Sequence, residues 1–248
     1  MPRICLDAGH FAKYNWNPNV IPTYWESLMA WDLHLMLKEE LEKYAGITVV
    51  TTRKDEEKDL ELIERGRAAR GCDLFLSLHS NAANSESVDR AVVIYPVSGK
   101  EFDLAAALAQ TITETMDLHD NWQTYIRWNS SNNADYYGVI RGAAAVGVPG
   151  LILEHSFHTH NASAVWLMDK DNLRRLAVAE AKVIAARFGC ALANETSVDI
   201  FEGRPRPFRV QIGAFNNSEN AIAQYNLAHE KGFDKTFIAD ANGKVVMY

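Results

Sequence analysis

Two histidines and two carboxylates stand where the sequence pattern predicts the ends of strands or the start of a helix. His10 and His79 each follow a short apolar run, Glu154 ends a third such run, and Glu26 opens a helical pattern. In open α/β sheets, functional side chains gather where strands end. Two imidazoles and a carboxylate form a typical set of zinc ligands that leaves one position for water. The remaining carboxylate, Glu154, can then move the protons of a hydrolysis.

These residues also have simple structural interpretations. A lone histidine at a strand end is more often a polar residue without a metal than a metal ligand. Two such histidines, each after a buried strand, are harder to explain by chance. The tetrapeptide Thr23-Tyr24-Trp25-Glu26 has the pattern of a capping box, in which Glu26 bonds back to the start of its own helix. One side chain cannot easily do both jobs, so the residues alone leave the role of Glu26 open.

Three further histidines follow Glu154 and are rival zinc ligands: His155, His158 and His160. Their spacing is not the helical His-Glu-x-x-His arrangement, and we interpret them as loop residues. Glu154 itself ends an apolar strand, where a carboxylate is costly unless it is paired or functional.

The elements that must position these side chains alternate between strands and helices. The pattern predicts strands at 3–6, 47–51, 74–78, 91–95 and 150–153, a possible short strand at 139–141, and helices at 23–44, 59–70, 102–116 and 171–188. Such alternation predicts an α/β fold, with a twisted, largely parallel sheet flanked by helices on both faces. The polar and aromatic segment 120–137 has no clear period, and we interpret it as a surface loop that can line a substrate groove.

Composition excludes several classes of partner. The chain has 248 residues and a formal net charge of -7, which argues against nucleic acid because nucleic-acid binding usually needs a basic patch. Its cysteines, Cys5, Cys72 and Cys190, lack metal-ligand spacing. No apolar run reaches membrane-spanning length, so no membrane partner is expected. The first residues lack the regions of a signal peptide, so we expect synthesis in the cytoplasm.

The composition changes towards the C-terminus. We predict a main domain at 1–189, a linker at 190–207 that ends in Arg204-Pro205-Arg206-Pro207, and a small α+β segment at 208–248 with a strand, a helix and one or two further strands. About forty residues are marginal for independent folding. This segment is therefore expected to pack on the main domain or to pair with a second chain as a homodimer.

Taken together, several segments resemble the zinc-dependent N-acetylmuramoyl-L-alanine amidases of the Amidase_3 family over roughly residues 3–188. The matching pieces are Leu6-Asp7-Ala8-Gly9-His10, Glu26, Thr52-Arg53, Leu62 through Arg65, Asp73 through Asn81, and Pro149 through Phe157. The departures are Phe11, where glycine is usual, and His155 and His160, which replace a commoner threonine and asparagine. They affect the expected shape of the groove rather than the metal set.

The resemblance implies one Zn²⁺ on His10, Glu26 and His79, with Glu154 as the catalytic acid and base. The implied reaction is cleavage of the amide bond between N-acetylmuramic acid and L-alanine in peptidoglycan. The lack of a signal peptide favours release of the enzyme by holin or mother-cell lysis. The segment from Phe208 to Phe215 resembles the opening of a SPOR repeat, a module that binds peptidoglycan. Two alternatives stay open: a zinc peptidase that cuts within the stem peptide, and an inactive wall-binding module. A phage, prophage or sporulation origin is equally open.

Overall fold

The chain forms two compact units, Met1–Thr196 and Ser197–Tyr248, which are described separately. The structure is a computed structural model that describes residues 1–193, 218–230, 237–239 and 245–247. The first unit contains all four candidate site residues. Among the described helices, none is both long enough and apolar enough to cross a lipid bilayer.

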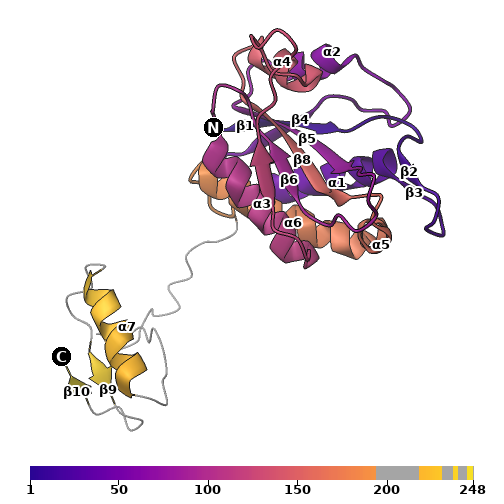
Figure 1. Cartoon of the computed structure of the whole chain (residues 1–248). Helices are drawn as coiled ribbons and strands as arrows, with labels where there is room; N and C mark the ends of the chain where they lie inside the picture. The colour runs from indigo at the N-terminus through magenta and orange to yellow at the C-terminus, as the bar shows by residue number, and fades with distance from the viewer. Residues whose placement is uncertain (194–217, 231–236, 240–244, 248) are drawn as a thin grey trace. The chain divides into compact units, whose positions relative to one another are not determined.

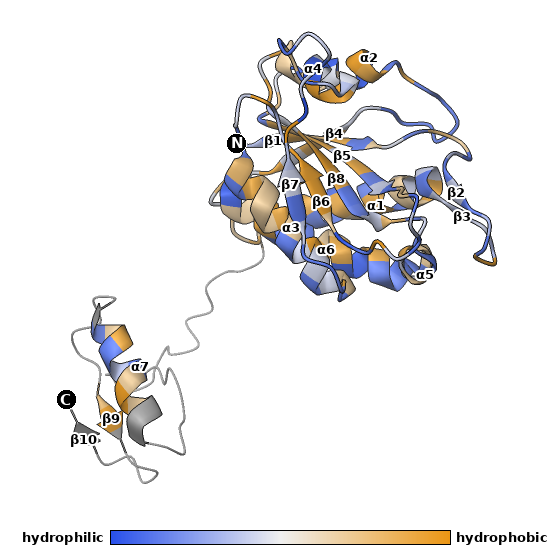
Figure 2. Ribbon diagram, in the orientation of Figure 1, coloured by the Kyte–Doolittle hydropathy of each residue, from blue (hydrophilic) through white to orange (hydrophobic). Residues whose placement is uncertain are grey.

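A six-stranded mixed sheet lies at the centre of the first unit (Figure 1). Its strand order is β4 (Thr48–Thr51), β1 (Arg3–Ala8), β5 (Leu74–Asn81), β8 (Gly150–Phe157), β6 (Val92–Ile94) and β7 (Gln123–Tyr125). Neighbouring strands run parallel, except that β6 runs antiparallel to β8. The three central strands are nearly continuous apolar runs, as expected for a sheet buried on both faces, and Figure 2 shows this hydrophobic centre. The predicted α/β fold is confirmed.

Helices cover both faces of this sheet. One face packs against α1 (Glu26–Leu41), α3 (Phe102–Met116), α5 (Asn161–Met168) and α6 (Lys170–Arg187). The short helices α2 (Leu62–Arg67) and α4 (Gly138–Ala144) lie over the other face (Figure 1). Side chains in β5 alternate between the two cores: Leu74, Leu76 and Leu78 pack in the larger one and Phe75 in the smaller one.

Several elements differ from the sequence prediction. The possible strand at 139–141 is wrong: these residues lie in α4, whose Val139 and Ile140 are buried in the smaller core. Val139 and Ile140 are β-branched and favour a strand locally, but packing against α2 favours the helix. The segment 120–137 is not wholly a loop, because it contains β7, a short edge strand paired with β6. A two-residue pair, β2 (Trp16–Asn17) and β3 (Tyr24–Trp25), precedes α1.

The second unit contains a helix and a pair of antiparallel strands within the described residues. These are α7 (Ser218–Glu230), β9 (Ile238–Ala239) and β10 (Val245–Met247). The strand expected at the start of this segment, including Phe208 to Phe215, lies outside the described residues.

Close packing of α2 on α4 depends on Gly142. A Cβ atom at Gly142 would lie 2.1 Å from the carbonyl oxygen of Ile63, so the two helices would have to move apart. We expect Gly142→Ala to destabilise the protein by about 1–3 kcal/mol through overpacking, despite a gain in helix propensity of roughly 1 kcal/mol. Urea unfolding measures the change. Gly99→Asn is the control, because nothing lies within 4 Å of a Cβ there and asparagine tolerates its positive φ. An unchanged midpoint for Gly142→Ala would contradict the packing argument.

Candidate active site

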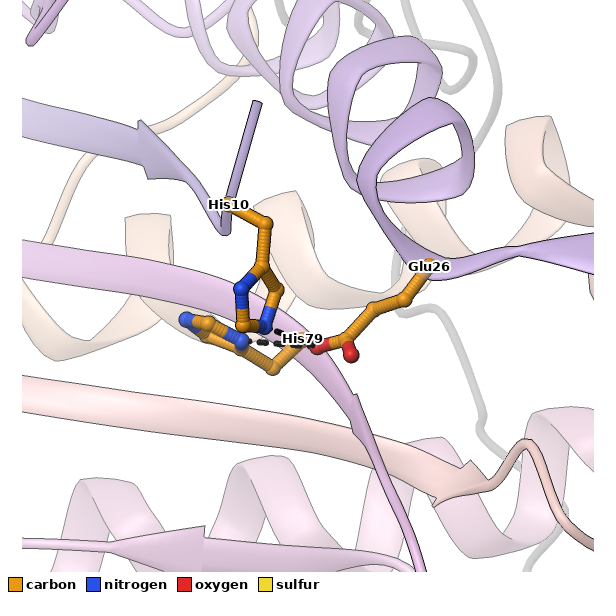
Figure 3. Close-up of side chains that lie close together, drawn as sticks. All are labelled: His10, Glu26 and His79. Carbon is orange, nitrogen blue, oxygen red and sulfur yellow. Dashed lines mark hydrogen bonds and ion pairs between the residues drawn. The ribbon is translucent and has the colours of Figure 1, made fainter. Parts of the chain in front are cut away.

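Three predicted ligands converge at the carboxyl end of the sheet. His10 follows β1, His79 lies near the end of β5, and Glu26 is the first residue of α1. Oε1 of Glu26 lies 2.8 Å from Nδ1 of His79 and 3.2 Å from Nε2 of His10 (Figure 3). One possible ligand atom from each residue lies within 4.8 Å of the other two, which suits a single metal ion. No other group of this kind occurs in the described part of the chain.

The local electrostatics favour a positive charge in front of Glu26. Its side chain is almost fully buried. Burial alone would raise the pKa of Glu26, but hydrogen bonds from His10 and His79 outweigh burial and hold this pKa well below its usual value. Burial would likewise lower the pKa of His79, yet the hydrogen bond and charge of Glu26 raise it to about 9. An ionised, buried carboxylate that faces two imidazoles therefore fits a divalent cation.

The role of Glu26 left open by the sequence is decided by its contacts. The first turn of α1 has no side-chain cap, so the capping box does not form. The Glu26 carboxylate instead accepts hydrogen bonds from Asn15 Nδ2 at 2.6 Å and from the backbone N–H of Ser80 at 3.1 Å. Ser80 is itself held through its Oγ, which lies 2.7 Å from the hydroxyl of Tyr24. These contacts aim the carboxylate at the two histidines.

The backbone at His10 is held in an uncommon conformation. Its φ is 57°, and its carbonyl oxygen accepts hydrogen bonds from Arg53 Nη2 and Arg65 Nη2, both at 2.7 Å. A Cβ at Gly9 would lie 2.4 Å from the ring of His79, so only glycine lets the two chain segments approach this closely. The family pattern Asp7-Ala8-Gly9-His10 thus has a packing reason at its third position.

A chain of polar contacts orients the His79 ring. Nε2 of His79 lies 3.1 Å from Oγ of Ser77, and Ser77 donates to Oδ2 of Asp7 at 2.7 Å. Asp7 also accepts from Thr52 at 2.6 Å and from Arg65 at 3.2 Å. Because the Ser77 hydroxyl proton goes to Asp7, its oxygen accepts from Nε2–H, a tautomer assigned here from the bond network. With Nε2–H fixed in this way, Nδ1 is the nitrogen that faces Oε1 of Glu26, and a metal would replace the Nδ1 proton that otherwise bonds to this carboxylate.

Glu154 lies beside His79 on the neighbouring strand, where the two residues are register partners. Its Oε2 is buried and has no hydrogen-bond partner among the residues that the structure describes. Burial, reinforced by the charge of Glu26 and opposed by His79 and His155, raises the pKa of Glu154 to about 7. A carboxyl group in this range can both take and give a proton near neutral pH.

The three histidines after Glu154 occupy different surroundings. His155 lies within β8, so its interpretation as a loop residue is wrong; it is fully buried, with Nε2 2.6 Å from Glu180 and Nδ1 2.8 Å from the carbonyl oxygen of His79. His160 caps the start of α5. His158 bonds to Ser80, and its Nδ1 lies 3.8 Å from Oε2 of Glu26. None of the three belongs to the convergent cluster.

A cavity of about 330 Å³ opens onto these groups. Its lining includes the four candidate site residues, together with Asn15, Leu62, Ser80, Asn81, Ala82, Tyr137, Gly138, Val139, Ile152 and His158. The volume suits a small part of a larger molecule. Residues from α2 and α4 line it opposite the ligand cluster, so the packing of these two helices shapes the cavity.

The comparison with protein families decides the classification. The family model described as N-acetylmuramoyl-L-alanine amidase matches residues 4–186. The chain belongs to this family. It is an N-acetylmuramoyl-L-alanine amidase, an enzyme that hydrolyses peptidoglycan, and its His10–Glu26–His79 cluster is consistent with the metal site of the family. Neither a zinc peptidase that cuts within the stem peptide nor an inactive wall-binding module is needed to account for these residues.

Individual relatives of this amidase are distant in sequence. The sporulation-specific N-acetylmuramoyl-L-alanine amidase of Bacillus subtilis (strain 168) is 24% identical over 239 residues, which cover 94% of this chain and 83% of the relative. The catalytic domain of CwlV, an N-acetylmuramoyl-L-alanine amidase from Bacillus (Paenibacillus) polymyxa var. colistinus, matches with a TM-score of 0.63 and 23% identity, over 76% of this chain and 99% of that one. Cwp6 from Clostridium difficile has the same TM-score and identity over 75% of this chain, which spans only 29% of Cwp6. The likeness to the two solved structures concerns the fold.

Sequence reasoning missed the residues that orient the ligands in this amidase. Ser77 is a fully buried hydroxyl within an apolar strand, and a polar residue in such a run is a signal that could have been noticed. Asn15 left no comparable signal, because it lies in a loop already rich in asparagine.

Removal of the Ser77 hydroxyl should loosen the metal without removing a ligand. We expect Ser77→Ala to weaken metal binding by about 10–100-fold, the usual effect of losing a partner that orients a ligating histidine. Titration with a competing chelator measures the affinity. Ser87→Ala is the control, because Ser87 is exposed and its side chain bonds to the neighbouring, exposed Ser85 rather than to the candidate site. Equal affinities for both variants would mean that the Ser77–Asp7 contact does not fix the His79 ring.

Proposed function

We propose that His10, Glu26 and His79 hold one zinc ion and that Glu154 is the catalytic acid and base for cleavage of the bond between N-acetylmuramic acid and L-alanine. The observation that carries the proposal is the buried, unpartnered Oε2 of Glu154 beside three convergent candidate ligands. An unpaired buried carboxylate oxygen is costly, and a role in proton transfer gives a reason to keep it.

The donor set supports zinc as the metal. Imidazole nitrogens and a carboxylate oxygen are usual zinc ligands, and catalytic sites have three of them so that a fourth position stays open. When bound, zinc supplies Lewis acidity, which makes water a better nucleophile and the lactyl carbonyl a better electrophile. The ionised state of Glu26, maintained by its hydrogen bonds, contributes the negative charge that such an ion needs.

The protein's own groups then move the protons. Oε2 of Glu154 takes a proton from the attacking water as the oxygen forms a bond to the carbonyl carbon. When the carbon–nitrogen bond breaks, Glu154 returns this proton to the departing nitrogen of L-alanine. The raised pKa of Glu154 suits both halves of this exchange. Tyr137 and the segment before it contribute one wall for the polymer, which reaches the site from outside the small cavity.

Replacement of Glu154 separates metal binding from proton transfer. We expect Glu154→Gln to retain the metal and to lose about 10²–10⁴-fold in turnover, because glutamine keeps the size of the side chain but cannot accept the proton. The measurements are metal content by mass spectrometry of the purified protein and release of stem peptides from muropeptides.

His79→Ala is the contrasting variant. It removes a proposed ligand, so both metal and activity should be lost. If Glu154→Gln turned over within a few-fold of the wild type, a residue other than Glu154 would transfer the proton. Full retention of zinc by His79→Ala would overturn the ligand assignment.

For the C-terminal part we propose a role in holding the enzyme on the wall. The support is the SPOR-like sequence at Phe208 to Phe215 and the separate compact unit Ser197–Tyr248. In this proposal a linker joins an amidase domain at 1–189 to a wall-binding segment at 208–248. An unpaired strand edge in so small a unit would favour pairing with a second copy, and the resulting homodimer would double the contacts with the wall.

Truncation tests this role. A chain that ends at Thr196 keeps the backbone hydrogen bonds that residues 191 and 193 form with residues 45 and 43. We expect it to cleave soluble muropeptides at the rate of the full chain but to sediment less with whole sacculi, and light scattering should report a monomer. Loss of cleavage of soluble substrate in a folded truncated chain would show instead that the tail takes part in the reaction.

A further inference from the structure

A short hairpin between β7 and α4 stands at the edge of the cavity. The backbone N–H of Tyr136 donates to the carbonyl oxygen of Arg127 at 2.7 Å, and Asn129 N–H donates to Ala134 at 2.9 Å. Arg127 and Tyr136 are thus direct partners across the hairpin, and their side chains share one face. The next residue, Tyr137, lines the cavity together with Glu154.

This hairpin is fixed to the body of the domain. Asp135 is buried, and its Oδ1 accepts a hydrogen bond from the backbone N–H of Val97 at 2.8 Å. From the first turns of α4, Nη1 of Arg141 donates to the carbonyl oxygen of Asp135 at 2.9 Å and also to that of Tyr136. These hydrogen bonds fix the backbone of the hairpin to the rest of the domain, and the backbone of Arg127 is fixed with it.

The Arg127 guanidinium is oriented by aromatic rings. Its carbon lies 3.6 Å from the ring centre of Tyr136 and 5.9 Å from that of Tyr137, whose hydroxyl is 3.0 Å from the hydroxyl of Tyr125. Within the described residues, Arg127 forms no ion pair with a carboxylate. This cation–π stacking and a hydrogen bond to the side chain of Tyr137 preorient the planar fork, and the guanidinium N–H groups outside that bond remain for a ligand.

The charge of the cavity explains what such a cation can do. Glu26 and Glu154 line it, and none of the described residues in its lining is a lysine or arginine. A stem peptide is itself anionic, and its first carboxylate beyond L-alanine lies within one residue of the scissile bond. The lining offers no lysine or arginine to this carboxylate, and Arg127 on the hairpin beside the cavity can supply the opposite charge.

We propose that Arg127 binds this stem-peptide carboxylate and so fixes the peptide side of the substrate, with Tyr136 and Tyr137 as its support. The proposal rests on the proposed function, because it gives the substrate of that site a direction: the peptide leaves past the 127–137 hairpin. Arg127 is a specificity-determining residue that discriminates a free carboxylate at this position from the corresponding amide.

Binding of two peptides to the full chain tests the proposal independently of cleavage. One peptide begins L-alanine–D-glutamate with a free α-carboxylate, and the other has that carboxylate amidated. The dissociation constants are measured by NMR titration for the wild type, Arg127→Gln, Arg127→Lys and the control Arg70→Gln. Arg70 is an exposed arginine that does not line the cavity, so its replacement removes the same charge elsewhere.

We expect the wild type and Arg70→Gln to prefer the free carboxylate, and Arg127→Gln to lose about 10–100-fold in affinity for that peptide alone, as for a charged hydrogen bond. Arg127→Lys should recover only part of the loss, because an ammonium lacks the planar fork. Equal losses for both peptides, no loss for either, or no binding of either to the wild type would each overturn the proposal. Absence of amidase activity with these preferences intact would instead count against the catalytic assignment alone.

Discussion

The buried, ionised carboxylate of Glu26 is the constraint on which the site depends. A carboxylate removed from water is costly unless hydrogen bonds and an opposite charge replace its hydration. Here Asn15 and the backbone of Ser80 provide the hydrogen bonds, while His10 and His79 face the open side. The remaining design follows from this arrangement, since every chain segment that supplies a partner must be held in place to within hydrogen-bond distance.

The ends of the strands are held by a second network. Arg53 and Arg65 both donate to the carbonyl oxygen of His10, and two like charges so close together require nearby anions. Asp7 and Asp59 supply them to Arg65. Asp7 also reaches His79 through Ser77, so one buried carboxylate links the backbone of one histidine to the ring of the other. The position of the His10 backbone and the orientation of the His79 ring therefore depend on each other through Asp7.

Much of this was predictable from the sequence because buried parallel strands have a strong local signature. Apolar runs that are followed by His10, His79 or Glu154 indicated both the strands and the edge of the sheet at which these side chains meet. The helix α4 was not predictable in this way, since Val139 and Ile140 favour a strand locally and become helical only through contact with α2. The hydrogen-bond relay through Ser77 depends on which strand lies beside β1, and the choice between two roles for Glu26 depended on Ser80, far away in sequence. Contacts of this kind form only in the tertiary structure and cannot be inferred from local sequence patterns.

The order of these residues along the chain has a consequence for biosynthesis. His10 follows β1, Glu26 begins α1 and His79 lies in β5, and all three are synthesised before β8 brings Glu154. A nascent chain on the ribosome thus exposes the full set of proposed metal ligands while it still lacks Glu154, the proposed proton-transfer group. At ordinary translation rates of about 5–20 residues per second, this interval lasts on the order of seconds. In the proposed mechanism, the growing polypeptide cannot hydrolyse its substrate until β8, the last strand of the central sheet to be synthesised, is complete.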